Sequence, residues 1–124
     1  MDAAQALADL TEISSQIEAA VLFSADGSVA GSTLAGEAAA QELAHGALEL
    51  LDLAGGSRVT QVEASTREGC VFVVRDGERG IVAVTSPDPT VGLVFYDLKG
   101  ALRGAAGEKP KRRRPAKKEE GDGS

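Results

Sequence analysis

The stretch VLFSADGSVAGST (residues 21–33) places an Asp-Gly pair between two short, mostly apolar runs. Such a pair is a strong hairpin indicator, because glycine adopts the positive φ that a tight turn requires. Loops rich in Gly and Ser also bind phosphate or present a nucleophilic serine. This stretch, however, lacks the Lys of a phosphate-binding loop and has no base to activate Ser28 beside Asp26. We therefore interpret Asp26-Gly27 as a turn joining two strands.

A helix is predicted before this hairpin, over residues 2–17. Its apolar residues recur every three or four positions, at Ala3, Leu7, Leu10, Ile13 and Ile17. This spacing is typical of one helix face. Asp2 is a suitable N-cap for it.

A second helix is predicted after the hairpin, over residues 36–54, ending at Gly55-Gly56. Its polar residues share an arc of roughly 140°, which leaves an apolar arc of roughly 220°, about twice what one packing surface requires. Complete burial inside the domain would also explain this arc, but a chain of 124 residues has little material to cover such a helix. The pattern favours a subunit interface.

Three strands and a last helix follow. Residues 58–66 alternate polar and apolar, as in a half-exposed edge strand, whereas residues 69–76 and 80–86 are apolar on both faces, as in central strands. Asp88 can cap the last helix, with Pro89 at its first position. The apolar stripe of this helix comprises Val91, Val94, Phe95, Leu98, Ala101 and Leu102.

The order of elements is helix, two strands, helix, three strands, helix. The segments that form these elements are LTEISSQIEAAVLFSADGSVAGST, AAAQELAHGALELL, GCVFVVRDGERGIVAVTS and DPTVGLVFYDL. In this order of elements, and in these segments, the chain resembles the roadblock/dynein light-chain family. The resemblance implies an α+β, profilin-like fold with a five-stranded antiparallel sheet, one helix on one face and two on the other. It covers about residues 2–104, so we expect a roadblock-like domain over residues 1–105 and a disordered tail over residues 106–124.

The resemblance also implies a homodimer, formed by pairing the second helices and the third strands into a continuous ten-stranded sheet. The wide apolar arc and the edge-like alternation point independently to those elements. The expected dimer interface comprises Leu43, Gly46, Ala47, Leu50, Ala54, Val59 and Gln61. Roadblock proteins are non-enzymatic modules that bind or regulate small Ras-like GTPases, or light subunits of larger assemblies. A GTPase regulator and a structural adaptor are therefore both expected functions.

Charge divides the chain into two parts. Residues 1–107 hold 6 basic and 15 acidic residues, whereas residues 108–124 hold 7 basic and 4 acidic residues. The basic residues of the tail are Lys109, Lys111, Arg112, Arg113, Arg114, Lys117 and Lys118. They would attract nucleic acid, an anionic surface or an acidic partner, or they serve only solubility. With a single Cys, no signal-peptide pattern and no apolar run long enough to span a membrane, we expect a cytoplasmic protein.

Catalytic and metal-binding groups are sparse. Cys70 lies in an apolar strand, which favours a buried thiol over a catalytic pair with His45. Glu42 and His45 form a Glu-x-x-His pair, a spacing used in di-iron helix bundles, but the sequence lacks the additional carboxylates that such bundles direct toward the metals. An arginine finger at Arg67 or Arg79 is weighed against simple surface solubility, which is favoured. We expect no enzyme activity, no metal and no cofactor.

Overall fold

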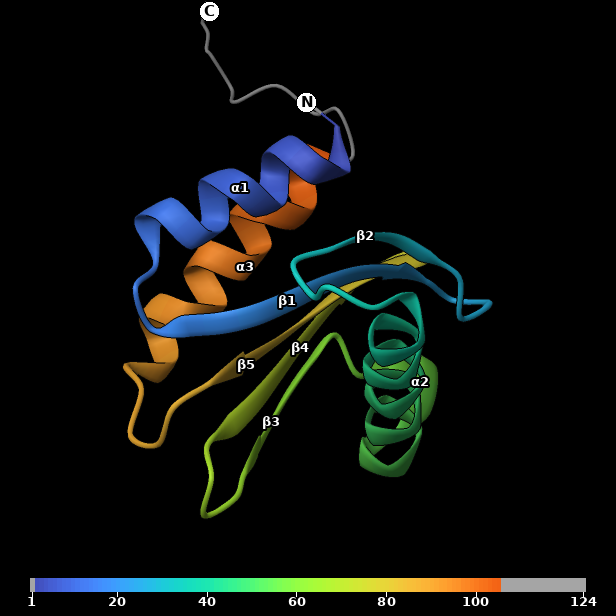
Figure 1. The fold of residues 1–124 in the computed structure, drawn as a ribbon. Coiled ribbons are helices and arrows are strands. Elements are labelled where there is room, and N and C mark those ends of the chain that lie inside the picture. Colours follow the sequence, from blue (N-terminus) through green and yellow to red (C-terminus); the bar gives the residue numbers. More distant parts are fainter. Residues whose placement is uncertain (1, 106–124) are drawn as a thin grey trace, which may run out of the picture.

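In the part of the chain that the structure describes, three helices cover a five-stranded antiparallel sheet, with α1 and α3 on one face and α2 on the other (Figure 1). The computed structural model describes residues 2–105, and the strand order is β2-β1-β5-β4-β3. The elements are α1 (Ala3–Ile13), β1 (Ile17–Ser24), β2 (Val29–Ser32), α2 (Glu37–Ala54), the short 3₁₀ turn η1 (Gly56–Arg58), β3 (Gln61–Ser65), β4 (Cys70–Asp76), β5 (Arg79–Thr85) and α3 (Val91–Ala105). The expected α+β architecture is confirmed.

The Asp26-Gly27 turn joins β1 to β2 as predicted. The Asp26 carboxylate accepts hydrogen bonds from the Ser28 backbone N–H at 2.9 Å and the Ser28 hydroxyl at 2.7 Å. These bonds favour the ionised carboxylate and lower the pKa of Asp26 below its ordinary value of 3.8. Gly27 has φ 91°, and a Cβ there would lie 2.9 Å from Nε2 of His45 on α2. The Asp26-Gly27 turn therefore packs against α2.

The core between the sheet and the α1–α3 layer contains the larger apolar side chains. Phe72 of β4 meets Phe95 of α3 edge to face, with ring centroids 5.1 Å apart. Leu10 and Leu98 are buried beside them. This layer holds two of the three phenylalanines and five of the six buried leucines, and their packing fixes α1 and α3 on the sheet.

The core beneath α2 is built differently. Three of the four α2 side chains buried in it are alanines, namely Ala40, Ala44 and Ala47, and the fourth is Leu51. They contact a surface of Val and Phe residues on the sheet. Because alanine is short, the α2 backbone lies close to the strands, and most of its leucines lie to the sides of the contact.

The first helix is shorter than predicted. It ends at Ile13, and Ile17 already belongs to β1. Ser14 adopts an extended conformation and its backbone N–H donates to the Leu10 carbonyl at 2.9 Å. Ile13, which we placed on the apolar face of this helix, is 69% exposed. The helical spacing of apolar residues extends beyond the end of α1 because Ile17, which fits that spacing, is buried as the first residue of β1.

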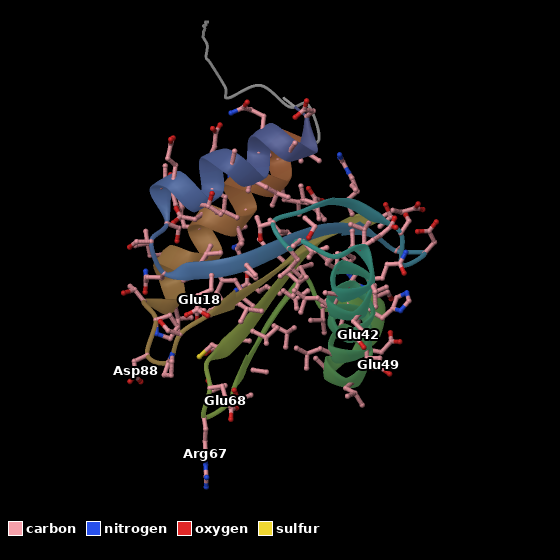
Figure 2. All side chains as sticks on the ribbon, viewed as in Figure 1. Glu18, Glu42, Glu49, Arg67, Glu68 and Asp88 are labelled. Atoms are coloured by element: carbon pink, nitrogen blue, oxygen red, sulfur yellow. The ribbon has the colours of Figure 1, made fainter. Side chains whose placement is uncertain are left out.

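The predicted start of the last helix is also wrong. The helix begins at Val91, and Asp88 takes a left-handed conformation with φ 62° in the preceding loop rather than capping it (Figure 2). The Thr90 backbone N–H instead donates to Oε1 of Gln16 at 2.6 Å. A residue 74 positions away in the sequence thus satisfies a backbone N–H at the start of α3. Val91 is exposed, whereas the rest of the predicted stripe faces the core.

The third strand lies at the edge of the sheet, as predicted, but it begins at Gln61 rather than Arg58. The residues before it form η1 and a short extended segment. Within residues 2–105, no helix has the length and apolarity needed to cross a membrane.

Candidate interaction surface

One flank of α2 carries apolar side chains that the domain leaves partly or largely uncovered. Successive helix residues are rotated by about 100°, so positions beside the alanine contact point sideways along the sheet. Leu43 and Leu50 are half-buried there, and Gly46 is exposed with no atom within 4 Å of a Cβ built on it. Leu53, one turn further, is 86% exposed. Glu42 and Glu49 lie beyond this flank (Figure 2). The flank forms a ready contact surface with one small residue at its centre.

The edge strand β3 adjoins the apolar flank. Among the described strands it pairs only with β4, so one row of its backbone N–H and C=O groups lacks a strand partner. Val62 and Ala64 lie opposite Val73 and Val71, on the sheet face that α2 covers. The half-buried Val62 packs against the same core cluster as Leu43 and Leu50. An exposed helix flank and an open strand edge thus form one surface.

We call this region the α2–β3 surface, and define it by Leu43, Gly46, Leu50, Leu53, Val59 and Val62. Of the residues expected at the dimer interface, Leu43, Leu50 and Val59 are half-buried, while Gly46, Ala54 and Gln61 are exposed. Gln61 lies opposite Val74 on the other face of the sheet.

Ala47 requires a correction. It is 2% exposed and lies in the α2 core of its own domain, so it is not accessible to a partner. The apolar arc of α2 is wide because it contains two kinds of apolar positions. One part is the alanine contact with the sheet, and the other is the leucine flank beside it. Sequence periodicity gives the width of the arc but not the line that divides these parts.

Arg75 holds the two halves of the α2–β3 surface together, a role that sequence reasoning missed. It lies near the end of β4, and its guanidinium donates to the backbone carbonyls of Gly56 and, at 2.6 Å, Val59. Its own backbone N–H donates to the Thr60 carbonyl at 2.7 Å. These bonds fix the connection between the end of α2 and the start of β3. The only local signal was a charged residue at the end of the apolar run VFVV.

The candidate catalytic groups are not brought together. Cys70 is buried in the core beneath α1 and α3, whereas His45 lies on α2 beside Gly27, on the opposite face of the sheet. Within residues 2–105, no group of three or more His, Cys, Asp or Glu side chains is arranged to hold a metal ion. Arg67 lies at the exposed tip of the β3–β4 hairpin (Figure 2), and Arg79 is exposed at the start of β5. The basic residues between Lys109 and Lys118 lie outside the described residues.

No family model matches the sequence, and no curated protein matches it. Solved structures do match the fold. A Roadblock/LC7 domain from Streptomyces avermitilis is 19% identical with a TM-score of 0.74, over 86% of this chain and 97% of that chain. The gliding protein MglB from Thermus thermophilus is 20% identical with a TM-score of 0.62, over 84% and 85% of the two chains.

A structure of MglB in a tetrameric arrangement is 21% identical with a TM-score of 0.59, over 82% of this chain and 85% of that chain. All three likenesses extend over most of both molecules, so they concern the whole domain rather than one motif. The strand order and the helix layers described above are therefore those of a known architecture: the chain has the fold of the Roadblock/LC7 domains.

Proposed function

We propose that this chain is a cytoplasmic, non-enzymatic homodimeric module that binds a small Ras-like GTPase and modulates its nucleotide cycle. The observation that carries the proposal is the α2–β3 surface, where an apolar helix flank continues into an open strand edge. The resemblance of the sequence to the roadblock family supports the GTPase as partner. The charged residues 106–124 are proposed to form a tail outside this module.

Self-association follows from the chemistry of the α2–β3 surface. An open strand edge is satisfied by a second strand, and β3 of another copy, running antiparallel, would provide one. The same two-fold pairing would bring the two Leu43–Leu53 flanks together, with Gly46 allowing close approach of the helices. A matching fold that has been solved in a tetrameric arrangement, that of MglB, supports this association.

Leu53→Glu is a direct test of self-association. Leu53 is 86% exposed, so the substitution leaves the monomer fold intact but buries a charge in the proposed dimer. Light scattering is expected to give a dimer for the wild type and a monomer for this variant. Glu49→Lys, on the exposed polar side of the same helix, is the matched control and should remain dimeric. A folded Leu53→Glu variant with dimer mass would exclude the α2–β3 surface as the interface.

The GTPase is tested in two steps. The chain lacks the Gly-x-x-x-x-Gly-Lys-Ser/Thr motif, so we propose that the partner carries the nucleotide. Immobilised protein is first incubated with native lysate loaded with GDP or with a non-hydrolysable GTP analogue, and captured GTPases are identified. Exchange and hydrolysis rates of the purified GTPase are then measured with and without the dimer. Unchanged rates with intact binding would favour a structural adaptor, and recovery of no GTPase would contradict the proposal.

A further inference from the structure

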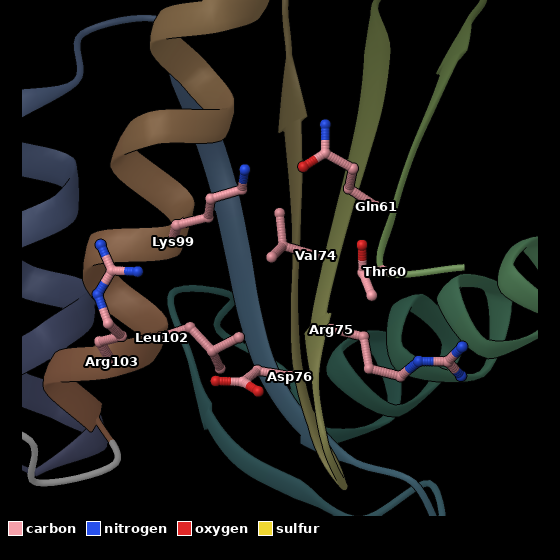
Figure 3. Close-up of a pocket in the computed structure, with 8 residues that line it drawn as sticks. All are labelled: Thr60, Gln61, Val74, Arg75, Asp76, Lys99, Leu102 and Arg103. Carbon is pink, nitrogen blue, oxygen red and sulfur yellow. The ribbon is translucent and has the colours of Figure 1, made fainter. Parts of the chain in front are cut away.

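A groove of about 180 Å³ lies on the α1–α3 face of the sheet, between the last turns of α3 and the start of β3 (Figure 3). Val74 of β4 and Leu102 of α3 contribute its apolar lining, and each is only 4% exposed. Thr60 and Gln61 line the side next to the edge strand. The groove therefore has two apolar residues at its base and mostly polar residues around them, and it lies on the sheet face opposite to α2.

The α3 wall of the groove is cationic. Lys99 and Arg103 are both exposed and are four residues apart, so they lie on one side of the helix. Both residues line the groove, and Figure 3 shows the Lys99 side chain extending from α3 toward the strands, whereas the Arg103 side chain runs along the helix. Within residues 2–105, neither forms an ion pair with a carboxylate in this structure. The guanidinium of Arg75, by contrast, points away from the groove toward the α2–η1 connection (Figure 3).

This cationic wall contrasts with the rest of the domain. Residues 2–105 contain six basic and fifteen acidic residues, yet three of the basic residues and only one carboxylate, that of Asp76, line the groove. Of these three, Lys99 and Arg103 form the α3 wall, and Arg75 has its guanidinium turned away. An acidic domain repels anions in general, so a local cationic wall favours an anionic group at this position. Charge therefore indicates the class of ligand.

Size limits the ligand further. Sites for small molecules and cofactors usually enclose about 300 Å³ or more, so the groove is too small for a nucleotide. A depression of this size, with an apolar floor, suits one aliphatic side chain of a peptide. We propose that the groove binds an acidic segment of a partner protein. An aliphatic side chain inserts between Val74 and Leu102, and flanking carboxylates pair with Lys99 and Arg103.

This docking site uses the sheet face opposite to α2, but one side of it is Gln61 of β3, the strand whose free edge pairs in the proposed dimer. The basic run of the chain begins at Lys109, only six residues after Arg103, and would itself attract any acidic peptide. The experiment must therefore separate the groove from the basic run. It must also test whether Glu119 and Glu120 of the same chain occupy the groove in place of a partner.

The probe is a fluorescein-labelled peptide of sequence Glu-Glu-Leu-Glu-Glu, added to the full-length protein at low salt and followed by fluorescence anisotropy. Lys99→Glu combined with Arg103→Glu is expected to weaken binding by about tenfold or more, which corresponds to about 1.4 kcal/mol. Arg67→Glu combined with Arg79→Glu makes the same change in net charge at exposed sites outside the groove and is expected to change binding by less than about twofold. Replacing the central Leu of the peptide by Ser is expected to weaken binding, since it removes the apolar anchor.

An independent measurement uses the wild type alone. Amide chemical shifts in NMR spectra are expected to move on peptide addition at Gln61, Val74 and Lys99, and not along α2. Equal losses from both charge-reversed pairs, or shifts confined to residues 106–124, would overturn the proposal in favour of non-specific attraction. If only a Glu119→Gln, Glu120→Gln variant binds the peptide, the groove belongs to the chain's own acidic end and the proposal of a partner segment is wrong.

Discussion

Replacing Arg75 by Ala should destabilise the protein specifically at the connection between α2 and β3. The Arg75 guanidinium donates to two backbone carbonyls, those of Gly56 and Val59, and a hydrogen bond from a charged donor contributes about 1.5–3 kcal/mol when well shielded. Arg75 is only half-buried, so in the variant water can donate some of the hydrogen bonds that the two carbonyls lose. We therefore expect a loss of about 2 kcal/mol in the free energy of unfolding, close to a 30-fold change in the equilibrium constant.

Urea unfolding at a fixed protein concentration measures this loss, and hydrogen exchange locates it. The Val59 amide, which donates to the Gly56 carbonyl at 3.0 Å, should exchange faster in the variant, whereas the amide of Val82 in the central strand β5 should change less. Arg79→Ala is the control, because Arg79 is an exposed arginine at the start of the neighbouring strand. If Arg75→Ala lost no more stability than Arg79→Ala, the proposed role of Arg75 would be refuted.

Three further predictions concern the domain itself. Ser14 is 3% exposed, and its hydroxyl has no partner among the described residues, so Ser14→Ala should raise the melting temperature; a lower value in calorimetry would indicate a bond to the hydroxyl. A Cβ at Gly80 would lie 2.5 Å from Cζ of the buried Phe23, so Gly80→Ala should cost about 1–3 kcal/mol in urea unfolding, and a neutral result would show that the ring can shift freely. Ser28→Ala should raise the pKa of Asp26 toward 3.8, as followed by carboxyl-carbon NMR. Because the folded-state pKa of Asp26 is lowered, its stabilising effect is present above pH 3.8 and is lost as the pH falls through that lowered pKa; Ser28→Ala should reduce this pH dependence, and an unchanged titration would show that the hydroxyl bond does not matter.

Local chemistry made much of the fold predictable. The Asp26-Gly27 turn, the helix ending at Gly55 and the edge-like alternation near β3 depend on neighbours in the sequence, and each was placed correctly. The errors arose where distant residues decide the structure. Gln16 accepts a hydrogen bond from the Thr90 N–H at the start of α3, where the sequence predicted a cap by Asp88. Arg75 bonds to the carbonyls of Gly56 and Val59, and the strand predicted from Arg58 begins only at Gln61.

The candidate surfaces were predictable only in part. The apolar excess of α2 indicated an exposed flank, but alanine and leucine positions look equivalent in a periodicity argument, and Ala47 was therefore assigned to the wrong side. The groove on the opposite face had a weak signal, namely two cations one turn apart at Lys99 and Arg103. Its other wall comes from β3 and β4, which no spacing along α3 can reveal.

The alanine contact beneath α2 has a consequence for how the molecule opens. Methyl groups bury little apolar area, so Ala40, Ala44 and Ala47 anchor the helix with less free energy than leucines would provide. In an isolated copy, α2 should therefore detach in low-energy partial unfolding, before the sheet or the α1–α3 layer separates. A second copy covering the leucine flank would suppress that opening. Amide protection along α2 should then rise with protein concentration, so the exchange rate of this helix would report the degree of self-association.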